Sequence, residues 1–381
     1  METAEVVIIG GGVVGTSIAY HLARQGCRGV LLLEKEPLLG TESTGACVGG
    51  IRFQFSTEVN IRLSLESRNS FLCFQEELGC DIGYRQHGYL FLATNPKVLG
   101  ELKSAVLLQQ ELGVPSEFLS PQDVSELVPL VDVRDVLGAS NCPWDGSADP
   151  YQVTQGYARE AKRLGVKFSV GREVTGIMAE DGIVQGVITP QGKISTRVVI
   201  NSAGPYGDVI GKMAGVKLPM APFRRQVFLA QHQRKYPDGL PLVVDTQAEF
   251  YFKQETEGFL LGRNIHEPSS FQKNLDWSSL DAVVEAAVQR VPDFQEARIA
   301  RGWAGLRSIT PDSHAILGEI SGARGFFCAV GFSGHGFMHA PITGRLMAEL
   351  VMEGRTSSLD ISPFHYKRFE ERDFSREAHV F

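Results

Sequence analysis

Residues 6–15, Val-Val-Ile-Ile-Gly-Gly-Gly-Val-Val-Gly, decide the fold, because an apolar strand runs directly into a GxGxxG turn. This pattern needs Gly10 for a tight turn, Gly12 for close approach of the backbone to phosphates, and Gly15 for packing of the next helix against the strand. The positive end of that helix then faces the anion. The pattern therefore predicts a dinucleotide site at the turn, with Val13 and Val14 among its contacts; the alternative is a tight corner that binds nothing.

The residues after the turn complete a βαβ unit. A helical stretch over 16–25 is followed by a second apolar run, Val30–Leu33, that ends on Glu34. Glu34 lies about 20 residues past the glycines, where a carboxylate binds the ribose of a dinucleotide. A carboxylate there would repel a 2′-phosphate, so NAD or FAD is favoured over NADP, with Lys35 as a neighbouring contact.

Composition indicates a soluble globular enzyme. The 381 residues are 43% hydrophobic and carry a net charge of −7 without a basic tract, so we expect neither a nucleic-acid partner nor an anionic membrane partner. The most apolar stretch, residues 6–23, is interrupted by four glycines, Tyr20 and His21, so it predicts neither a membrane span nor a signal peptide. The six cysteines are scattered without CxxC spacing, which favours free thiols and no metal site. We expect a cytoplasmic protein.

Strand and helix patterns alternate along the chain, which predicts an α/β fold of two interleaved domains. Helices are predicted at 57–78, 96–112, 151–164, 280–290 and 340–352, and strands at 88–93, 166–170, 173–188 (a pair turning at 180–182), 194–200, 223–231, 242–245, 249–253, 259–262 and 326–330. The short strands in sequence between 223 and 262 indicate a mainly antiparallel cap. We predict a Rossmann-type FAD-binding domain from 1–85, 143–215 and 301–381, with an antiparallel-sheet substrate-binding domain from 86–142 and 216–300.

Two more small-residue turns follow predicted strands. The strand at 194–200 runs into Asn201-Ser-Ala-Gly-Pro, where Ala203 and Gly204 permit a second close approach to the same dinucleotide. The strand at 326–330 runs into Gly331-Phe-Ser-Gly-His-Gly-Phe-Met. A nicotinamide enzyme needs one such loop, whereas a protein that binds FAD along its whole length needs several, so FAD is favoured over NAD. A simple crossover loop is the alternative at 331–336.

Together these motifs resemble the D-amino-acid-oxidase-like FAD oxidoreductases, which include glycine oxidase, sarcosine oxidases and the flavin subunits of heteromeric proline and sarcosine dehydrogenases. The resemblance spans almost the whole chain and includes Ser43-Thr44 through Gly49-Gly50-Ile51-Arg52, Val198–Gly204, and Gly302-Trp-Ala-Gly-Leu-Arg307 through Thr310-Pro-Asp. Residues 49–60 and 331–341 look most similar to the dehydrogenase flavin subunits. The resemblance implies that Glu34 binds the adenosine ribose, that the backbone of Val174 reaches the adenine, and that the following residues lie near the pyrophosphate or the flavin ring: Ser43, Thr44, Arg52, Gly334, His335, Gly336, Phe337 and Met338.

The resemblance also implies a reaction, in which a neutral amine gives hydride to flavin N5 and the resulting imine is hydrolysed. A substrate carboxylate in a dry pocket requires a planar, permanently charged partner. The resemblance implies that this partner is Arg307, because Trp-Ala-Gly-Leu-Arg is similar to the segment in which glycine oxidase and its relatives carry their carboxylate-binding arginine. A structural ion pair is the alternative for Arg307. Tyr251 either adds a hydroxyl to the same carboxylate or packs in the core, and His335 is predicted to contact the flavin through its backbone and not to act as the base.

Two departures from relatives modify the expected chemistry. Gly305 stands where monomeric sarcosine oxidases carry a flavin-linked cysteine, so we expect non-covalent FAD. Met338 stands where those oxidases place a lysine that favours electron transfer to oxygen, so we expect slow reaction with oxygen and a dehydrogenase in preference to an oxidase. We predict a catalytic set of Arg307, Tyr251, Arg52 and Met338.

The predicted substrate is a small amino acid or N-alkyl amino acid of the proline, sarcosine or glycine type. The similarity to heteromeric dehydrogenases suggests an electron-accepting partner subunit. Two alternatives stay open: a flavoprotein scaffold or assembly factor without small-molecule turnover, and an FAD-dependent 2-hydroxy acid oxidoreductase, for which no histidine in a pocket motif offers the required base.

Overall fold

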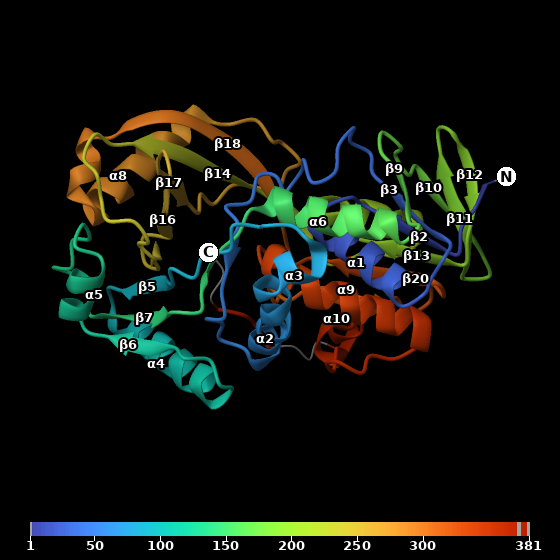
Figure 1. Cartoon of the computed structure of the whole chain (residues 1–381), viewed down its shortest axis with the longest axis horizontal. Coiled ribbons are helices and arrows are strands. Elements are labelled where there is room, and N and C mark those ends of the chain that lie inside the picture. The colour runs from blue at the N-terminus through green and yellow to red at the C-terminus, as the bar shows by residue number, and fades with distance from the viewer. Residues whose placement is uncertain (1, 372–374, 379–381) are drawn as a thin grey trace.

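The computed structural model describes residues 2–371 and 375–378 and builds the chain around two large β-sheets (Figure 1). One has six strands in the order β19-β20-β13-β2-β3-β9, and the other has eight in the order β18-β14-β17-β16-β15-β5-β7-β6. A four-stranded sheet, β1-β12-β11-β10, and a two-stranded one, β4-β8, complete the strand pairing of the described residues.

The six-stranded sheet carries the opening βαβ unit. Its strands are β2 (Val6–Ile9), β3 (Val30–Leu33), β9 (Lys167–Ser169), β13 (Val198–Asn201), β19 (Ile316–Glu319) and β20 (Phe326–Val330). All neighbours pair in parallel except β19, which runs antiparallel to β20. Every residue of β2, β3 and β20 is buried, which explains why these strands are continuous apolar runs without alternation.

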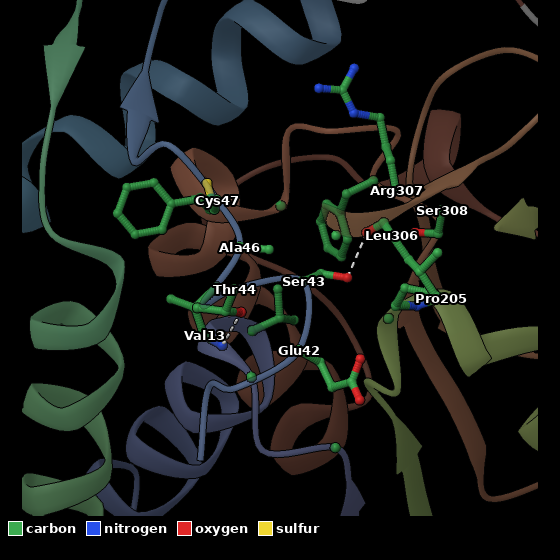
Figure 2. Close-up of a pocket in the computed structure, with 18 of the residues that line it drawn as sticks. Val13, Glu42, Ser43, Thr44, Ala46, Cys47, Pro205, Leu306, Arg307 and Ser308 are labelled. Atoms are coloured by element: carbon green, nitrogen blue, oxygen red, sulfur yellow. Dashed lines mark hydrogen bonds between the residues drawn. The ribbon is translucent and has the colours of Figure 1, made fainter. Parts of the chain in front are cut away.

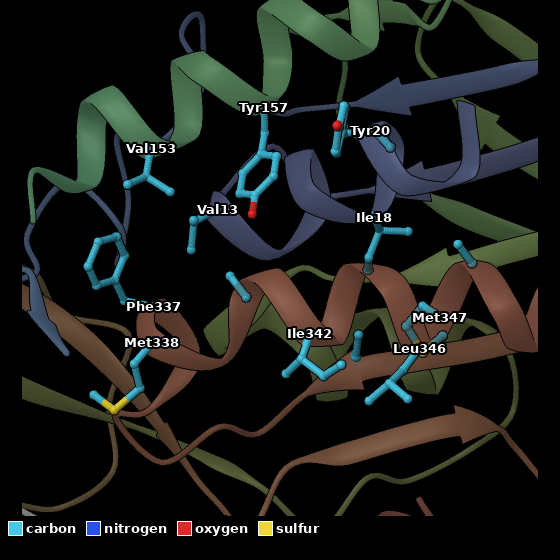
Figure 3. Packing of buried hydrophobic residues seen from close by; sticks show 14 of the residues in the cluster. Val13, Ile18, Tyr20, Val153, Tyr157, Phe337, Met338, Ile342, Leu346 and Met347 are labelled. Carbon is cyan, nitrogen blue, oxygen red and sulfur yellow. The ribbon is translucent and has the colours of Figure 1, made fainter. Parts of the chain in front are cut away.

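Helix α1 (Val13–Arg24) fills the centre of one layer against this sheet (Figure 3). It packs between α6 (Pro150–Arg163) and α9 (Gly336–Glu353), so that Tyr157 of α6 and Ile342 of α9 lie on either side of it. Helix α2 (Glu58–Leu72) in turn packs on α9. The remaining helices are α3 (Phe74–Leu78), α4 (Pro96–Glu111), α5 (Pro121–Leu127), α7 (Gly207–Met213), α8 (Leu280–Arg290) and α10 (Arg368–Glu371).

The eight-stranded sheet has one packed face and one face toward the pocket described below. Its strands are β5 (Tyr89–Ala93), β6 (Glu117–Leu119), β7 (Gly138–Cys142), β14 (Ala221–Gln231), β15 (Leu242–Asp245), β16 (Phe250–Glu255), β17 (Gly258–Arg263) and β18 (Arg298–Ile309). Phe228, Phe252 and Leu261 cover Val283 and Ala287 of α8. Because side chains alternate along a strand, the residues between them face the opposite way.

Several predicted boundaries need correction. The single strand expected at 194–200 is two strands in different sheets, β12 (Gly192–Ser195) and β13, separated by Thr196 and Arg197. The helix expected at 57–78 is interrupted at Cys73, and α9 begins at Gly336 instead of 340. The predicted turn at 180–182 does join β10 (Gly176–Glu180) to β11 (Ile183–Thr189). The two short sheets also contain β1 (Glu2–Thr3), β4 (Gly50–Ile51) and β8 (Gly146–Ser147).

The division into two domains stays a prediction, and β18 crosses its boundary at 301 to pair with β14 in the eight-stranded sheet. All six cysteines are free thiols. Within the described residues, no helix is both long enough and apolar enough to cross a membrane.

Candidate active site

One long pocket runs from the carboxyl ends of the parallel strands to the open face of the eight-stranded sheet. Ile9 at the end of β2, Leu33 at the end of β3 and Ser202 just after β13 line one end, and Tyr251 of β16 and Arg307 of β18 line the other. The carboxyl edge of an open parallel sheet is where α/β proteins bind ligands. The pocket therefore extends from the carboxyl edge of the six-stranded sheet, where a nucleotide would bind, to the eight-stranded sheet.

The glycine turn at the strand end is packed too closely for side chains. A Cβ on Gly10, which has φ +110°, would lie 2.5 Å from the carbonyl oxygen of Ser202, and one on Gly15 would lie 2.0 Å from that of Gly10. Gly10 and Gly12 line the pocket, and the N-terminus of α1 begins there at Val13. Backbone amides of a first helical turn have no intrahelical acceptor, so this cradle fits the pyrophosphate of a dinucleotide.

Glu34 stands next to this cradle at the end of β3. Its side chain is buried and accepts hydrogen bonds from the backbone N–H of Gly11 (2.6 Å) and of Glu36 (2.8 Å). Burial raises the pKa of this carboxyl group. The backbone N–H of Arg172 binds the carbonyl of Glu34 (2.8 Å), which brings Val174 into the same end of the pocket.

The loop between β3 and β4 crosses the middle of the pocket (Figure 2). Thr44 Oγ1 accepts a hydrogen bond from the N–H of Val13 at the start of α1 (3.2 Å), and Ser43 Oγ donates to the carbonyl of Leu306 in β18 (2.6 Å). This loop thus ties the glycine turn to the eight-stranded sheet. Lys35 also lies at this point, with its ammonium group 3.7 Å from the centre of the Tyr206 ring.

A buried arginine–histidine contact lies at the other end of the pocket. Arg52 Nη2 is 3.1 Å from Nε2 of His335, and Arg52 also donates to the carbonyl of Gln54. Because a guanidinium only donates, Nε2 of His335 accepts and this ring is neutral with its proton on Nδ1. Burial, with Arg52 next, holds the pKa of His335 well below its usual range. The only unprotonated nitrogen of this ring already accepts a hydrogen bond from Arg52, so His335 is poorly placed to take a proton from a substrate.

The strand register places Tyr251 and Arg307 on the pocket face of the eight-stranded sheet. Tyr251 is opposite Gly262, Gly262 is opposite Val227, and Val227 is opposite Trp303, four residues before Arg307 on β18. Directly paired residues and residues two apart share one face of a sheet. A Cβ on Gly262 would lie 2.4 Å from the Tyr251 ring, so the bare glycine gives this ring its place.

Arg307 has no carboxylate partner among the described residues. No hydrogen bond or ion pair to its guanidinium is found there, and its side chain extends away from the Ser43–Leu306 contact (Figure 2). Burial lowers the pKa of Arg307, with the Tyr251 hydroxyl as the largest opposing influence, and burial raises the pKa of Tyr251 to about 12. A buried cation that no protein anion compensates is suited to bind an anionic ligand.

The predicted site residues fall in this one pocket, apart from Gly15, which packs behind the turn. Those that line it are Gly10, Gly12, Val13, Val14, Glu34, Lys35, Ser43, Thr44, Arg52, Val174, Ala203, Gly204, Tyr251, Gly305, Arg307, Gly334, His335, Gly336, Phe337 and Met338. Their roles as ligand contacts stay predictions.

Sequence reasoning missed several lining residues, among them Tyr89, Phe91, Tyr206 and Arg225. Arg225 carried no clear signal, because it stands between the polar residues Arg224 and Gln226, and only the pairing of β14 with β18 places it beside Arg307. The aromatic residues carried none either, because they are equally typical of a core.

Comparison with protein families shows that a family model described as "FAD dependent oxidoreductase" matches residues 5–350. Mitochondrial sarcosine dehydrogenase from Homo sapiens is 32% identical over 99% of this chain, which covers 43% of that protein. The chain thus spans less than half the length of this curated relative.

Two solved structures match over almost their whole length. L-proline dehydrogenase from P. horikoshii is 34% identical, with a TM-score of 0.91 and coverage of 98% of this chain and 99% of that one. Glycine oxidase from Geobacillus kaustophilus is 26% identical, with a TM-score of 0.87 and coverage of 97% and 99%. The α/β architecture is therefore shared with these proteins.

Proposed function

This chain belongs to the family of FAD-dependent oxidoreductases, and we propose that it oxidises the Cα–N bond of a small amino acid or N-alkyl amino acid with non-covalently bound FAD. The observation that carries this proposal is the pair Arg307 and Tyr251, a guanidinium without a protein anion and a hydroxyl on one wall of the pocket. They supply the charge and the hydrogen-bond donor that a substrate carboxylate requires.

The residues at the nucleotide end fit FAD. The first turn of α1 and the glycines beside it would hold the pyrophosphate, and Glu34 would hold the adenosine ribose. A side chain on Gly305 would lie 2.5 Å from Cβ of Ala46, which leaves no room at that position for a cysteine that links to the flavin. This close contact supports non-covalent binding.

Bound FAD supplies a two-electron acceptor: the Cα–H leaves as hydride, the C–N bond becomes C=N, and water then adds to the imine. The protein positions the substrate for this step. Arg307 and Tyr251 hold the carboxylate and so fix the Cα, while the neutral His335, occupied by Arg52, leaves the amine without a strong base at this wall. The substrate ammonium group must therefore lose its proton to water before hydride transfer, because only the neutral amine can give up hydride.

Anaerobic flavin reduction tests the proposal. Purified holoprotein is mixed with glycine, sarcosine, proline and D-alanine, and with the hydroxy analogues glycolate and lactate, while the flavin absorbance is followed. We expect bleaching by an amine and not by its hydroxy analogue. Bleaching only by the hydroxy acids would favour a 2-hydroxy acid oxidoreductase, and no bleaching by any compound would favour a scaffold.

Two variants locate the chemistry at the proposed wall. Arg307→Lys keeps the charge but loses bidentate geometry, so we expect at least a tenfold rise in the substrate concentration for half-maximal reduction. Arg301→Gln, an exposed arginine on the same strand, is the matched control and should leave this concentration unchanged. Admitting air afterwards shows whether oxygen reoxidises the flavin, as in an oxidase, or whether another acceptor such as a partner subunit is needed, as in a dehydrogenase. Because Met338 lines the pocket, we expect slow reoxidation by oxygen and thus a dehydrogenase.

A further inference from the structure

A second arginine, Arg225, lines the same pocket wall as Arg307. On β14, Arg225 is directly opposite Gly305 of β18, and Phe223 is directly opposite Arg307. Arg225 and Arg307 are therefore diagonal neighbours on one face of the sheet, and the Cβ atoms of such neighbours are typically no more than about 7–8 Å apart. Gly305, the residue directly opposite Arg225, adds no side chain to this face.

Arg225 resembles Arg307 in lacking a carboxylate partner among the described residues. Its Nη1 donates to the carbonyl of Arg224 (2.8 Å), and its buried Nε has no hydrogen-bond partner. The carboxylates that influence it are committed elsewhere: Glu267 binds Arg224 (2.8 and 3.0 Å), and Glu249 binds His266 (2.6 Å).

The charges around this wall leave one cation more than a single carboxylate can match. Burial and then the proximity of Arg307 lower the pKa of Arg225 to about 10, and Glu249 and Glu267 oppose this shift only in part. A monocarboxylate held by Arg307 and Tyr251 would neutralise one of the two arginines. Arg52 differs from these two arginines because the carboxyl groups of Glu377 and Asp145 act on its charge and oppose the effect of burial on its pKa.

We propose that Arg225 binds a second anionic group of the substrate, so that this site prefers a short amino dicarboxylate over the corresponding monocarboxylate. The proposal rests on the proposed function, in which Arg307 and Tyr251 hold the first carboxylate. The second carboxylate takes no part in the bond changes: hydride still leaves Cα, the C–N bond becomes C=N, and both carboxylates are released unchanged. Arg225 is a specificity determinant and not a reacting group.

Matched substrate pairs test the preference. Sarcosine and iminodiacetate, alanine and aspartate, and 2-aminobutyrate and glutamate each differ by one carboxylate in place of a hydrogen, and both enantiomers of the chiral ones are used. We expect at least a tenfold higher kcat/KM for one dicarboxylate than for its partner. Arg225→Gln should reduce that ratio to about one, and Arg301→Gln should leave the ratio intact. FAD content and Tm of each variant establish that the fold is kept.

A binding measurement without turnover separates the failure of this proposal from failure of the proposed function. Succinate and propionate also differ by one carboxylate and contain no amine, so their Kd values for the holoprotein are measured by calorimetry. Tighter binding of succinate that disappears in Arg225→Gln supports the second anion site even if no amine is oxidised. Equal Kd values for the two acids, or a succinate preference that survives in Arg225→Gln, would overturn it, whatever the activity toward amines.

Discussion

Replacing Gly15 by alanine tests the link between helix packing and cofactor binding most directly. The added Cβ would lie 2.0 Å from the carbonyl oxygen of Gly10 and 2.7 Å from Oγ of Ser202, whereas real Cβ atoms essentially never come closer than 3.0 Å. Helix α1 or the glycine turn must therefore shift by about 1 Å. Overpacking of this kind costs about 1–3 kcal/mol.

The same strain weakens FAD binding if α1 has to return to its original place to face the pyrophosphate. A cost of about 1–3 kcal/mol corresponds to a Kd raised about 5- to 150-fold. Apoprotein is titrated with FAD and the quenching of flavin fluorescence is followed, with Tm of the apoprotein measured in parallel. Gly100→Ala is the control, because Gly100 is exposed in α4, has no atom within 4 Å of an added Cβ, and gains helix propensity.

We expect Gly15→Ala to lower Tm of the apoprotein and to raise the Kd for FAD, and Gly100→Ala to do neither. If Gly15→Ala bound FAD as tightly as the unmodified chain, the proposed role of α1 as the pyrophosphate site would be wrong. A lower Tm with an unchanged Kd would refute it equally, because the strain would then be relieved away from the ligand.

Three further predictions concern buried charges and the flavin environment. Arg290 and Asp245 are buried as an ion pair, with 2.6 Å between Nη2 and Oδ2. Arg290→Met should lower the free energy of unfolding in urea by about 3–5 kcal/mol, because it leaves the Asp245 carboxylate buried without a partner. The double variant with Asp245→Leu should lose clearly less, and equal losses would contradict a paired charge. Burial raises the pKa of Asp145 to about 7, above its unfolded value of 3.8. The folded state then binds more protons than the unfolded state, so the contribution of Asp145 to stability falls as pH rises from about 4 to 7. In urea unfolding, the stability of Asp145→Asn should therefore increase relative to that of the unmodified chain over this pH range. A difference in stability that does not change with pH would refute this prediction. Met338→Lys should speed the reaction of reduced flavin with oxygen in stopped flow, with Met338→Leu as the control; equal rates in the two variants would remove Met338 as the reason for slow oxidation.

The parts of the fold that could be predicted from sequence are those in which one local pattern determines both the type of secondary structure and the neighbouring strand or helix. The run Val6–Ile9 and the glycines after it specify a buried parallel strand and its turn, and they lie as expected. The stretch at 194–200 shows the limit, because its residues are uniformly strand-forming. The Thr196 hydroxyl donates to the carbonyl of Glu5, 191 residues away in sequence, and the chain passes there from one sheet to another. Such a change depends on a distant contact that no local pattern contains.

The pocket wall has the same dependence on distant pairing, and it explains why Arg307 was found from sequence and Arg225 was not. Arg307 is identified by a local motif. Arg225 is identified as a pocket residue only by its pairing with Gly305, about 80 residues further along the chain. Strand β18 was not predicted, so the register that pairs these residues was out of reach. Once that register is known, alternation along β14 and β18 requires both arginines to face the pocket. In the function that we propose, substrate choice therefore depends on a cross-strand relation. Arg307 of the motif would bind one carboxylate, and Arg225, its neighbour across the sheet, would bind a second.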